Sequence, residues 1–110
     1  MILGTGGVVK FMNRAGLAMI GAESIDEVLG QPVHRLVVPE HREAFARLNE
    51  QVFAGENGSL EFEIVGLKGT RRWLETHAVP MKDKAGNVES LLGITRDVTE
   101  HRRAEQALSV

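Results

Sequence analysis

Three segments near the C-terminus decide the fold: residues 60–65 read LEFEIV, residues 72–81 read RWLETHAVPM, and residues 88–98 read VESLLGITRDV. In the first segment apolar residues alternate with glutamates, which is the period-two pattern of a half-buried strand. Only the short loops 66–70 and 82–87 separate the segments, so consecutive strands are expected to pair antiparallel. This stretch therefore predicts a three-stranded meander.

A long amphipathic helix is predicted immediately before the meander. Pro39 suits the first helical position, because its missing N–H is not needed there. The helix is expected to run to about Phe53 and to pack on the sheet with one stripe of side chains. Spacings of four, three and four place on that stripe His41, Phe45, Leu48 and Val52.

Shorter elements are predicted at the N-terminal end. The apolar runs Met1–Leu3 and Val8–Met12 flank a glycine-rich turn and read as two strands. Asn13 is placed to cap a helix over Arg14–Ile20, and Ser24–Glu27 reads as a capping box. An isolated hairpin is only marginally stable, so both strands are expected to join the meander. The result is an α+β fold: a five-stranded antiparallel sheet with three or four short helices on one face.

Composition and motifs exclude several classes of function. The chain has 110 residues, 13 Lys+Arg against 15 Asp+Glu, and no cysteine. No basic excess points to nucleic acid, and no apolar run approaches the ~18 residues of a membrane span. The four histidines match no common metal motif, and Glu61 and Glu63 are predicted on the outer face of a strand rather than as a catalytic pair. We therefore expect a cytoplasmic, non-enzymatic domain without metal, membrane contact or nucleic acid.

The end of the chain carries the most specific motif. Residues 93–100 read GITRDVTE and are followed by RRAE at 102–105. This sequence is similar to the exit motif of PAS domains, the sensory box of bacterial signal-transduction proteins. Weaker matches follow the same order as in that family, and they read NRA at 13–15, EVLG at 27–30, PEHR at 39–42 and WLE at 73–75.

The resemblance implies a sensory core over residues 1–98 and the start of a C-terminal signalling helix over residues 99–110. In that family a cavity between the sheet and the long helix holds ligands or cofactors. The domain is then expected to regulate an output domain on the same chain, most often a sensor histidine kinase of a two-component system. A diguanylate cyclase or phosphodiesterase is the alternative parent.

Alternation predicts which side chains face this cavity. The last strand leaves two choices open, because either Leu92 and Ile94 or Leu91 and Gly93 point inward. The composition suits a small, largely apolar organic ligand. The alternative is a filled core, in a module that only dimerises. The candidate lining is His41, Phe45, Leu48, Val52, Leu60, Phe62, Ile64, Leu74, Thr76, Ala78 and Gly93.

The sequence also bears on the cofactors known in the family. The flavin-photoreceptor branch forms an adduct with a cysteine, and this chain has none, so that chemistry is excluded. The haem-binding branch uses a histidine of the long helix, and alignment from Gly55 places Ala44 at that position. Haem is therefore not expected, although His41 lies on the inward stripe.

The outer face of the sheet and the exit helix are predicted to carry the interactions of the domain. Trp73 and Val79 alternate with the inward residues, so they are expected on the outer face, where the resemblance implies a homodimer contact. The residues expected to pass a signal from the last strand to the exit helix are Asp97, Thr99, Glu100 and Arg102. Either Arg72 or Arg102 is expected to pair with Asp97.

Overall fold

The computed structural model describes residues 1–108 and contains the predicted five-stranded antiparallel sheet, in the order β2-β1-β5-β4-β3. The predicted meander is confirmed, since β3 pairs with β4 and β4 with β5, both antiparallel. The two N-terminal strands join it as predicted, through pairing of β1 with β5. The strands are β1 Ile2–Leu3, β2 Val9–Phe11, β3 Gly58–Val65, β4 Arg71–Lys82 and β5 Val88–Asp97.

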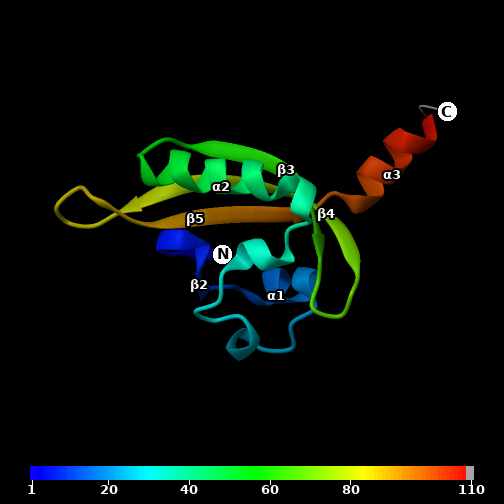
Figure 1. The fold of residues 1–110 in the computed structure, drawn as a ribbon, viewed down its shortest axis with the longest axis horizontal. Helices are drawn as coiled ribbons and strands as arrows, with labels where there is room; N and C mark the ends of the chain where they lie inside the picture. Colours follow the sequence, from blue (N-terminus) through cyan, green and yellow to red (C-terminus); the bar gives the residue numbers. More distant parts are fainter. Residues whose placement is uncertain (109–110) are drawn as a thin grey trace.

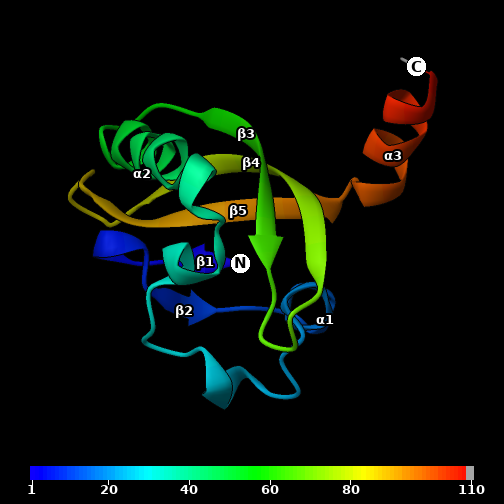
Figure 2. The same cartoon turned by 45° about the vertical axis from the view of Figure 1, so that its right-hand side comes forward.

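Short helices and the long α2 lie on one side of the curved sheet, and α3 projects away from its end (Figure 1 and Figure 2). The β4–β5 loop extends at the opposite end of the molecule. The helices are α1 Arg14–Ile20, α2 Pro39–Phe53 and α3 Thr99–Leu108, with 3₁₀ turns η1 Thr5–Gly7, η2 Ile25–Glu27 and η3 Val33–Leu36. The last two residues of the expected signalling helix, 109 and 110, lie outside the described residues.

Local capping explains where the N-terminal helices begin and end. The Asn13 side chain accepts a hydrogen bond from the Gly16 N–H at 2.9 Å, as the cap prediction requires. Gly21 ends α1 with a φ of 73°, a conformation that glycine adopts without a Cβ penalty. The predicted capping box of Ser24 and Glu27 is also present.

The core lies between α2 and the inner face of the sheet. Leu74, Thr76 and Ala78 of β4 are all buried, as their alternation predicts. The rings of Phe45 on α2 and Phe62 on β3 meet edge to face, with centroids 5.1 Å apart. Helix and sheet therefore share one interior.

The pairing register settles the facing of the last strand. Gly93 lies opposite the inward Ala78, and Leu91 lies opposite Pro80. Leu91 is 1% exposed, whereas Ile94 is 70% exposed. Of the two alternatives, Leu91 and Gly93 face inward. The sequence left the choice open because both pairs contain an apolar side chain.

Candidate functional site

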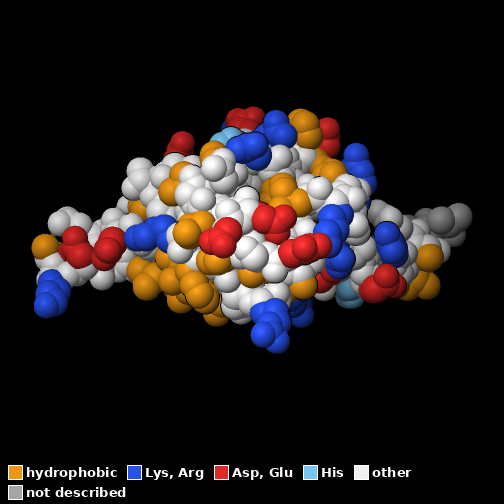
Figure 3. Space-filling model, turned by 90° about the horizontal axis from the view of Figure 1, so that it is seen from below, with side chains coloured by type: hydrophobic (Ala, Val, Ile, Leu, Met, Phe, Trp, Pro, Cys, Tyr) orange, Lys and Arg blue, Asp and Glu red, His pale blue; other side chains and the backbone are white. Residues whose placement is uncertain are grey.

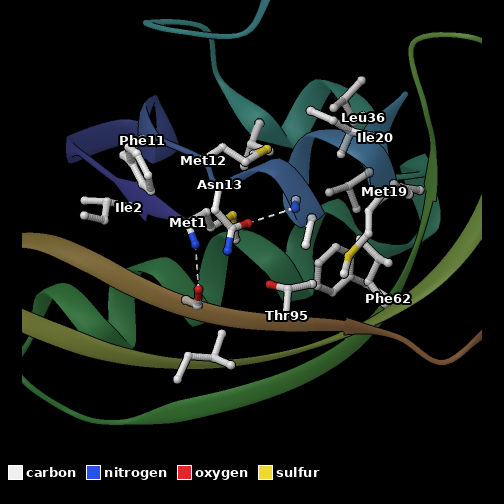
Figure 4. Close-up of a pocket in the computed structure, with 18 of the residues that line it drawn as sticks. Met1, Ile2, Phe11, Met12, Asn13, Met19, Ile20, Leu36, Phe62 and Thr95 are labelled. Atoms are coloured by element: carbon white, nitrogen blue, oxygen red, sulfur yellow. Dashed lines mark hydrogen bonds between the residues drawn. The ribbon is translucent and has the colours of Figure 1, made fainter. Parts of the chain in front are cut away.

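An apolar cavity of about 310 Å³ lies between the sheet and α1 (Figure 4). Its closed end is formed by the buried side chains of Phe45, Phe62 and Ile64. Its open end is formed by the exposed residues Phe11 and Ala15. The volume falls at the small end of the range of ligand pockets.

The structure brings part of the predicted lining together around this cavity. Five of the eleven candidate residues line it, namely Phe45, Phe62, Ile64, Leu74 and Gly93. Four others are buried in the core without lining the cavity, namely Leu48, Val52, Thr76 and Ala78. Leu60 is half-buried beside the core. His41 lies away from the cavity, at the edge of β3.

Sequence reasoning missed the wall that the N-terminal segment supplies. Met12, Gly16 and Met19 line the cavity from α1 and the residues before it, and Asn13 and Ile20 lie beside them. Their spacing of four and three is the pattern of a helix face, so the signal was present.

His41 makes two contacts that hold it outside the cavity. Its Nδ1 accepts a hydrogen bond from the backbone N–H of Glu63 at 2.9 Å. Its ring lies against Trp73, with centroids 5.1 Å apart. His41 therefore fastens the start of α2 to the sheet edge.

Trp73 lies on the outer face, as alternation predicts, and two side chains cover its ring. Arg102 of α3 is centred 3.7 Å above the ring, in cation–π geometry, and His41 contacts the ring as well. We call these three residues the Trp73 stack. Arg102 also donates to Glu61 at 3.2 Å. The stack joins the first turns of α2 and α3 across the sheet.

Asp97 forms the joint between β5 and α3. Its Oδ1 accepts a hydrogen bond from the backbone N–H of Thr99 at 2.9 Å, and its Oδ2 accepts one from Arg72 at 3.1 Å. The Thr99 hydroxyl oxygen in turn accepts the N–H of Trp73 at 2.9 Å. The open question of the arginine partner is thus settled in favour of Arg72. We call Arg72, Asp97 and Thr99 the exit joint.

Electrostatics favour the ionised form of Asp97. Partial burial raises the pKa of this carboxyl group, but the hydrogen bonds from Thr99 and the guanidinium of Arg72 outweigh burial and lower the pKa below its ordinary value. Glu100, the third residue of the predicted relay, is exposed and pairs with Arg103. The joint therefore depends on Asp97 and Thr99 rather than on Glu100.

Replacing Arg102 with alanine is expected to uncover Trp73 and to lower the free energy of unfolding by about 1 kcal/mol or less, the usual value of an exposed cation–π contact. Because Trp73 is the only tryptophan, its emission should shift to longer wavelength and become more accessible to acrylamide. Arg103→Ala, one residue away and paired only with Glu100 among the described side chains, is the control. Equal quenching in both variants would show that Arg102 does not cover the ring.

The outer face also carries an exposed apolar patch. Met81, Val79 and Ile94 are 38%, 37% and 70% exposed. The half-buried Leu92 pairs with Val79 across β4 and β5. Hydrophobic side chains gather near the β4–β5 loop, which forms the left-hand tip in Figure 3. We call Val79, Met81, Leu92 and Ile94 the outer patch.

Within residues 1–108, no group of three or more His, Cys, Asp or Glu side chains is arranged to hold a metal ion. No helix in this part of the chain has the length and apolar character needed to cross a membrane.

The curved antiparallel sheet and its helices enclose an apolar cavity, and the last strand leads directly into an exit helix. This is the architecture of a sensory domain. The chain matches the PAS fold family over residues 1–103, and it belongs to that family. The resemblance identified from the GITRDVTE motif is thereby confirmed.

Relatives and solved structures agree with this assignment. A blue-light-activated histidine kinase from Brucella ovis is 41% identical over 80 residues, which are 68% of this chain and 16% of that protein. A PAS domain from Colwellia psychrerythraea is 24% identical, with a TM-score of 0.79 over 90% of this chain and 84% of that chain. The light state of the blue-light photoreceptor Aureochrome1 LOV is 22% identical, with a TM-score of 0.77 over 92% of this chain and 81% of that chain. At these identities the solved structures support the fold alone.

Proposed function

We propose that this sensory domain binds a small, largely apolar ligand in the cavity and passes the resulting change to α3. One observation carries the proposal: Leu74, which lines the cavity, pairs in register with Asp97 of the exit joint. Thr95 also lines the cavity and lies two residues before Asp97. A ligand that shifts β4 against β5 therefore acts directly on the residues that hold α3.

The lining supports a small organic ligand better than flavin or haem. A cavity of about 150 Å³ binds benzene, which has six non-hydrogen atoms, so 310 Å³ holds about a dozen such atoms. The three-ring system of a flavin and the macrocycle of haem both contain more non-hydrogen atoms than this cavity holds. In the described part of the chain no histidine lines the cavity, and the sequence has no cysteine for a flavin adduct. We therefore assign neither cofactor to this domain.

We infer that the output is a histidine kinase on the same chain. The relatives that match this domain carry that name, and the match covers only 16% of the first of them. This favours a kinase over a diguanylate cyclase or phosphodiesterase. The exit helix α3 projects away from the sheet (Figure 1). The domain itself then regulates and does not catalyse.

Benzene is the probe that tests the cavity, because it is small enough to enter and the lining is mostly apolar. We expect saturable shifts of the methyl resonances of Ile20, Ile64 and Leu74 on titration. Ala15→Trp, at the open end, should abolish these shifts, whereas Ala18→Trp should keep them, since Ala18 is exposed on α1 and does not line the cavity. A wild-type protein without saturable shifts would overturn the ligand proposal.

A second copy of this chain is the partner that the outer patch supports. Exposed apolar side chains on adjacent strands form a surface that two copies can bury against each other. Trp73 itself is covered by Arg102, so Val79 and Ile94 are the better contact residues. Ile94→Glu should shift sedimentation toward the monomer, while Leu67→Glu, at an exposed apolar residue of the β3–β4 loop, should not. A wild type that stays monomeric at high concentration would exclude the dimer.

A further inference from the structure

We infer that the cavity selects an uncharged ligand whose carbonyl oxygen accepts hydrogen bonds from both Asn13 and Thr95. The inference rests on the proposed ligand-binding function and names the chemistry of the ligand. Asn13 and Thr95 line opposite walls and extend toward the space between them (Figure 4). They are the polar side chains among a lining that is otherwise apolar or glycine.

The helix cap fixes which atom Asn13 presents to the cavity. Its Oδ1 accepts the N–H of Gly16 at 2.9 Å. The amide is therefore oriented with Nδ2 on the other side, and Figure 4 shows this nitrogen directed toward Thr95. No acceptor for Nδ2 is found among residues 1–108. Asn13 is exposed, so its Nδ2 is a donor that a ligand reaches at the open end of the cavity.

Burial of Thr76 fixes the direction of the second hydrogen bond. The hydroxyl oxygens of Thr76 and Thr95 are 2.8 Å apart, and either could donate on distance alone. Thr76 is 0% exposed, and within the described chain Thr95 is the one partner of its hydroxyl group. A buried hydroxyl hydrogen without an acceptor is unfavourable, so Thr76 donates to Thr95. The hydrogen of Thr95 is then free to donate into the cavity.

Two donors on uncharged side chains define the ligand. A carbonyl oxygen has two lone pairs and suits a pair of N–H and O–H donors. Among residues 1–108 no Lys, Arg or His side chain lines the cavity, so a buried carboxylate would find no side-chain counter-ion there. The amino group of Met1 already donates to the carbonyl of Gly93 at 2.7 Å, and burial lowers its pKa. The ligand is therefore a neutral ketone, aldehyde, ester or amide with an apolar body.

Three probes of equal size separate these possibilities. Acetophenone carries a carbonyl group, cumene replaces the oxygen with a methyl group, and benzoate carries a negative charge. We expect acetophenone to bind about tenfold more tightly than cumene, as one to two net hydrogen bonds imply. Benzoate should bind more weakly than acetophenone. Dissociation constants are measured from methyl shifts of Ile20, Ile64 and Leu74 in the complete chain.

Two variants test the individual donors. Asn13→Ser keeps a hydroxyl group able to cap α1 but removes the amide donor. Thr76→Val combined with Thr95→Val removes both hydroxyl groups. The double change is used because Thr95→Val alone would leave the buried hydroxyl group of Thr76 without an acceptor. Each variant should weaken acetophenone binding about fivefold, the value of one net hydrogen bond, and leave cumene binding within a factor of about two.

The outcomes distinguish the two levels of the proposal. If cumene or benzoate binds as tightly as acetophenone, the carbonyl inference is wrong while ligand binding stands. The same holds if both variants bind acetophenone like the wild type. If no probe binds at saturation, the ligand-binding function fails and the carbonyl inference with it.

Discussion

Replacing Phe45 with alanine is expected to lower the free energy of unfolding by about 3–5 kcal/mol, the usual loss for a buried aromatic side chain. Phe45 is 1% exposed and its ring packs edge to face against Phe62. It also lines the closed end of the cavity. The void left by the ring would be continuous with 310 Å³ that is already open, so the surrounding residues cannot easily collapse into it. Urea denaturation followed by circular dichroism measures the change.

Phe11→Ala is the matched control, because Phe11 also lines the cavity but is 50% exposed. It should lower the free energy of unfolding by less than about 1 kcal/mol, since little apolar surface is lost from the core. Equal losses in the two variants would contradict the assignment of closed and open ends. A loss below about 1 kcal/mol in Phe45→Ala would show that α2 does not share the interior of the sheet.

Local sequence signals predicted the elements because the relevant interactions are local. Asn13 caps α1 through a bond to a residue three positions away. Pro39 begins α2 and Gly21 ends α1 for reasons contained in their own backbone chemistry. Alternation likewise placed Leu74 inward, because successive side chains of a strand point to opposite faces of the sheet. These signals need no knowledge of the partner element.

The site needed long-range information that local patterns do not contain. Asn13 lines the cavity only because α1 lies over β5, some eighty residues away in the sequence. From the sequence, Arg72 and Arg102 were equally good candidates for an ion pair with Asp97. The pairing of β4 with β5 brings Arg72 next to Asp97. His41 follows the inward stripe of α2, yet it lies at the first turn, where the helix has reached the sheet edge. The spacing along α2 predicted the face of the helix on which His41 lies, but it did not predict its contacts with Glu63 and Trp73.

Asp97→Ala is expected to release α3 while leaving the core folded. The change removes the acceptor for the Thr99 backbone N–H and the partner of Arg72. Losing a capping side chain of this kind weakens a helix end by about 1–2 kcal/mol. Backbone amides of α3 should then exchange with solvent roughly tenfold faster, since each 1.4 kcal/mol changes an equilibrium about tenfold. Amides of β3 and β4 should keep their protection. In a parent kinase the variant should uncouple output from ligand.

Glu100→Ala is the control, because Glu100 is exposed and pairs only with Arg103 within the described chain. It should leave exchange in α3 within a factor of about two, as a surface ion pair contributes little. Comparable acceleration in both variants would show that α3 frays for reasons unrelated to Asp97. Unchanged exchange in Asp97→Ala would remove the exit joint from the proposed relay.

Lowering the pH should destabilise the exit joint, because the pKa of Asp97 is lowered in the folded protein. The carboxylate stabilises the folded joint fully above its unfolded pKa, near 3.8, and this contribution is lost as the pH falls through the lower folded value. Asp97→Asn has no such titration. Trp73 lies beneath Arg102, so its emission reports whether α3 is docked. Below pH 3.8 the emission of the wild type should approach that of the variant, whereas at pH 6 the two should differ. Parallel curves over the whole range would mean that protonation of Asp97 does not release the helix.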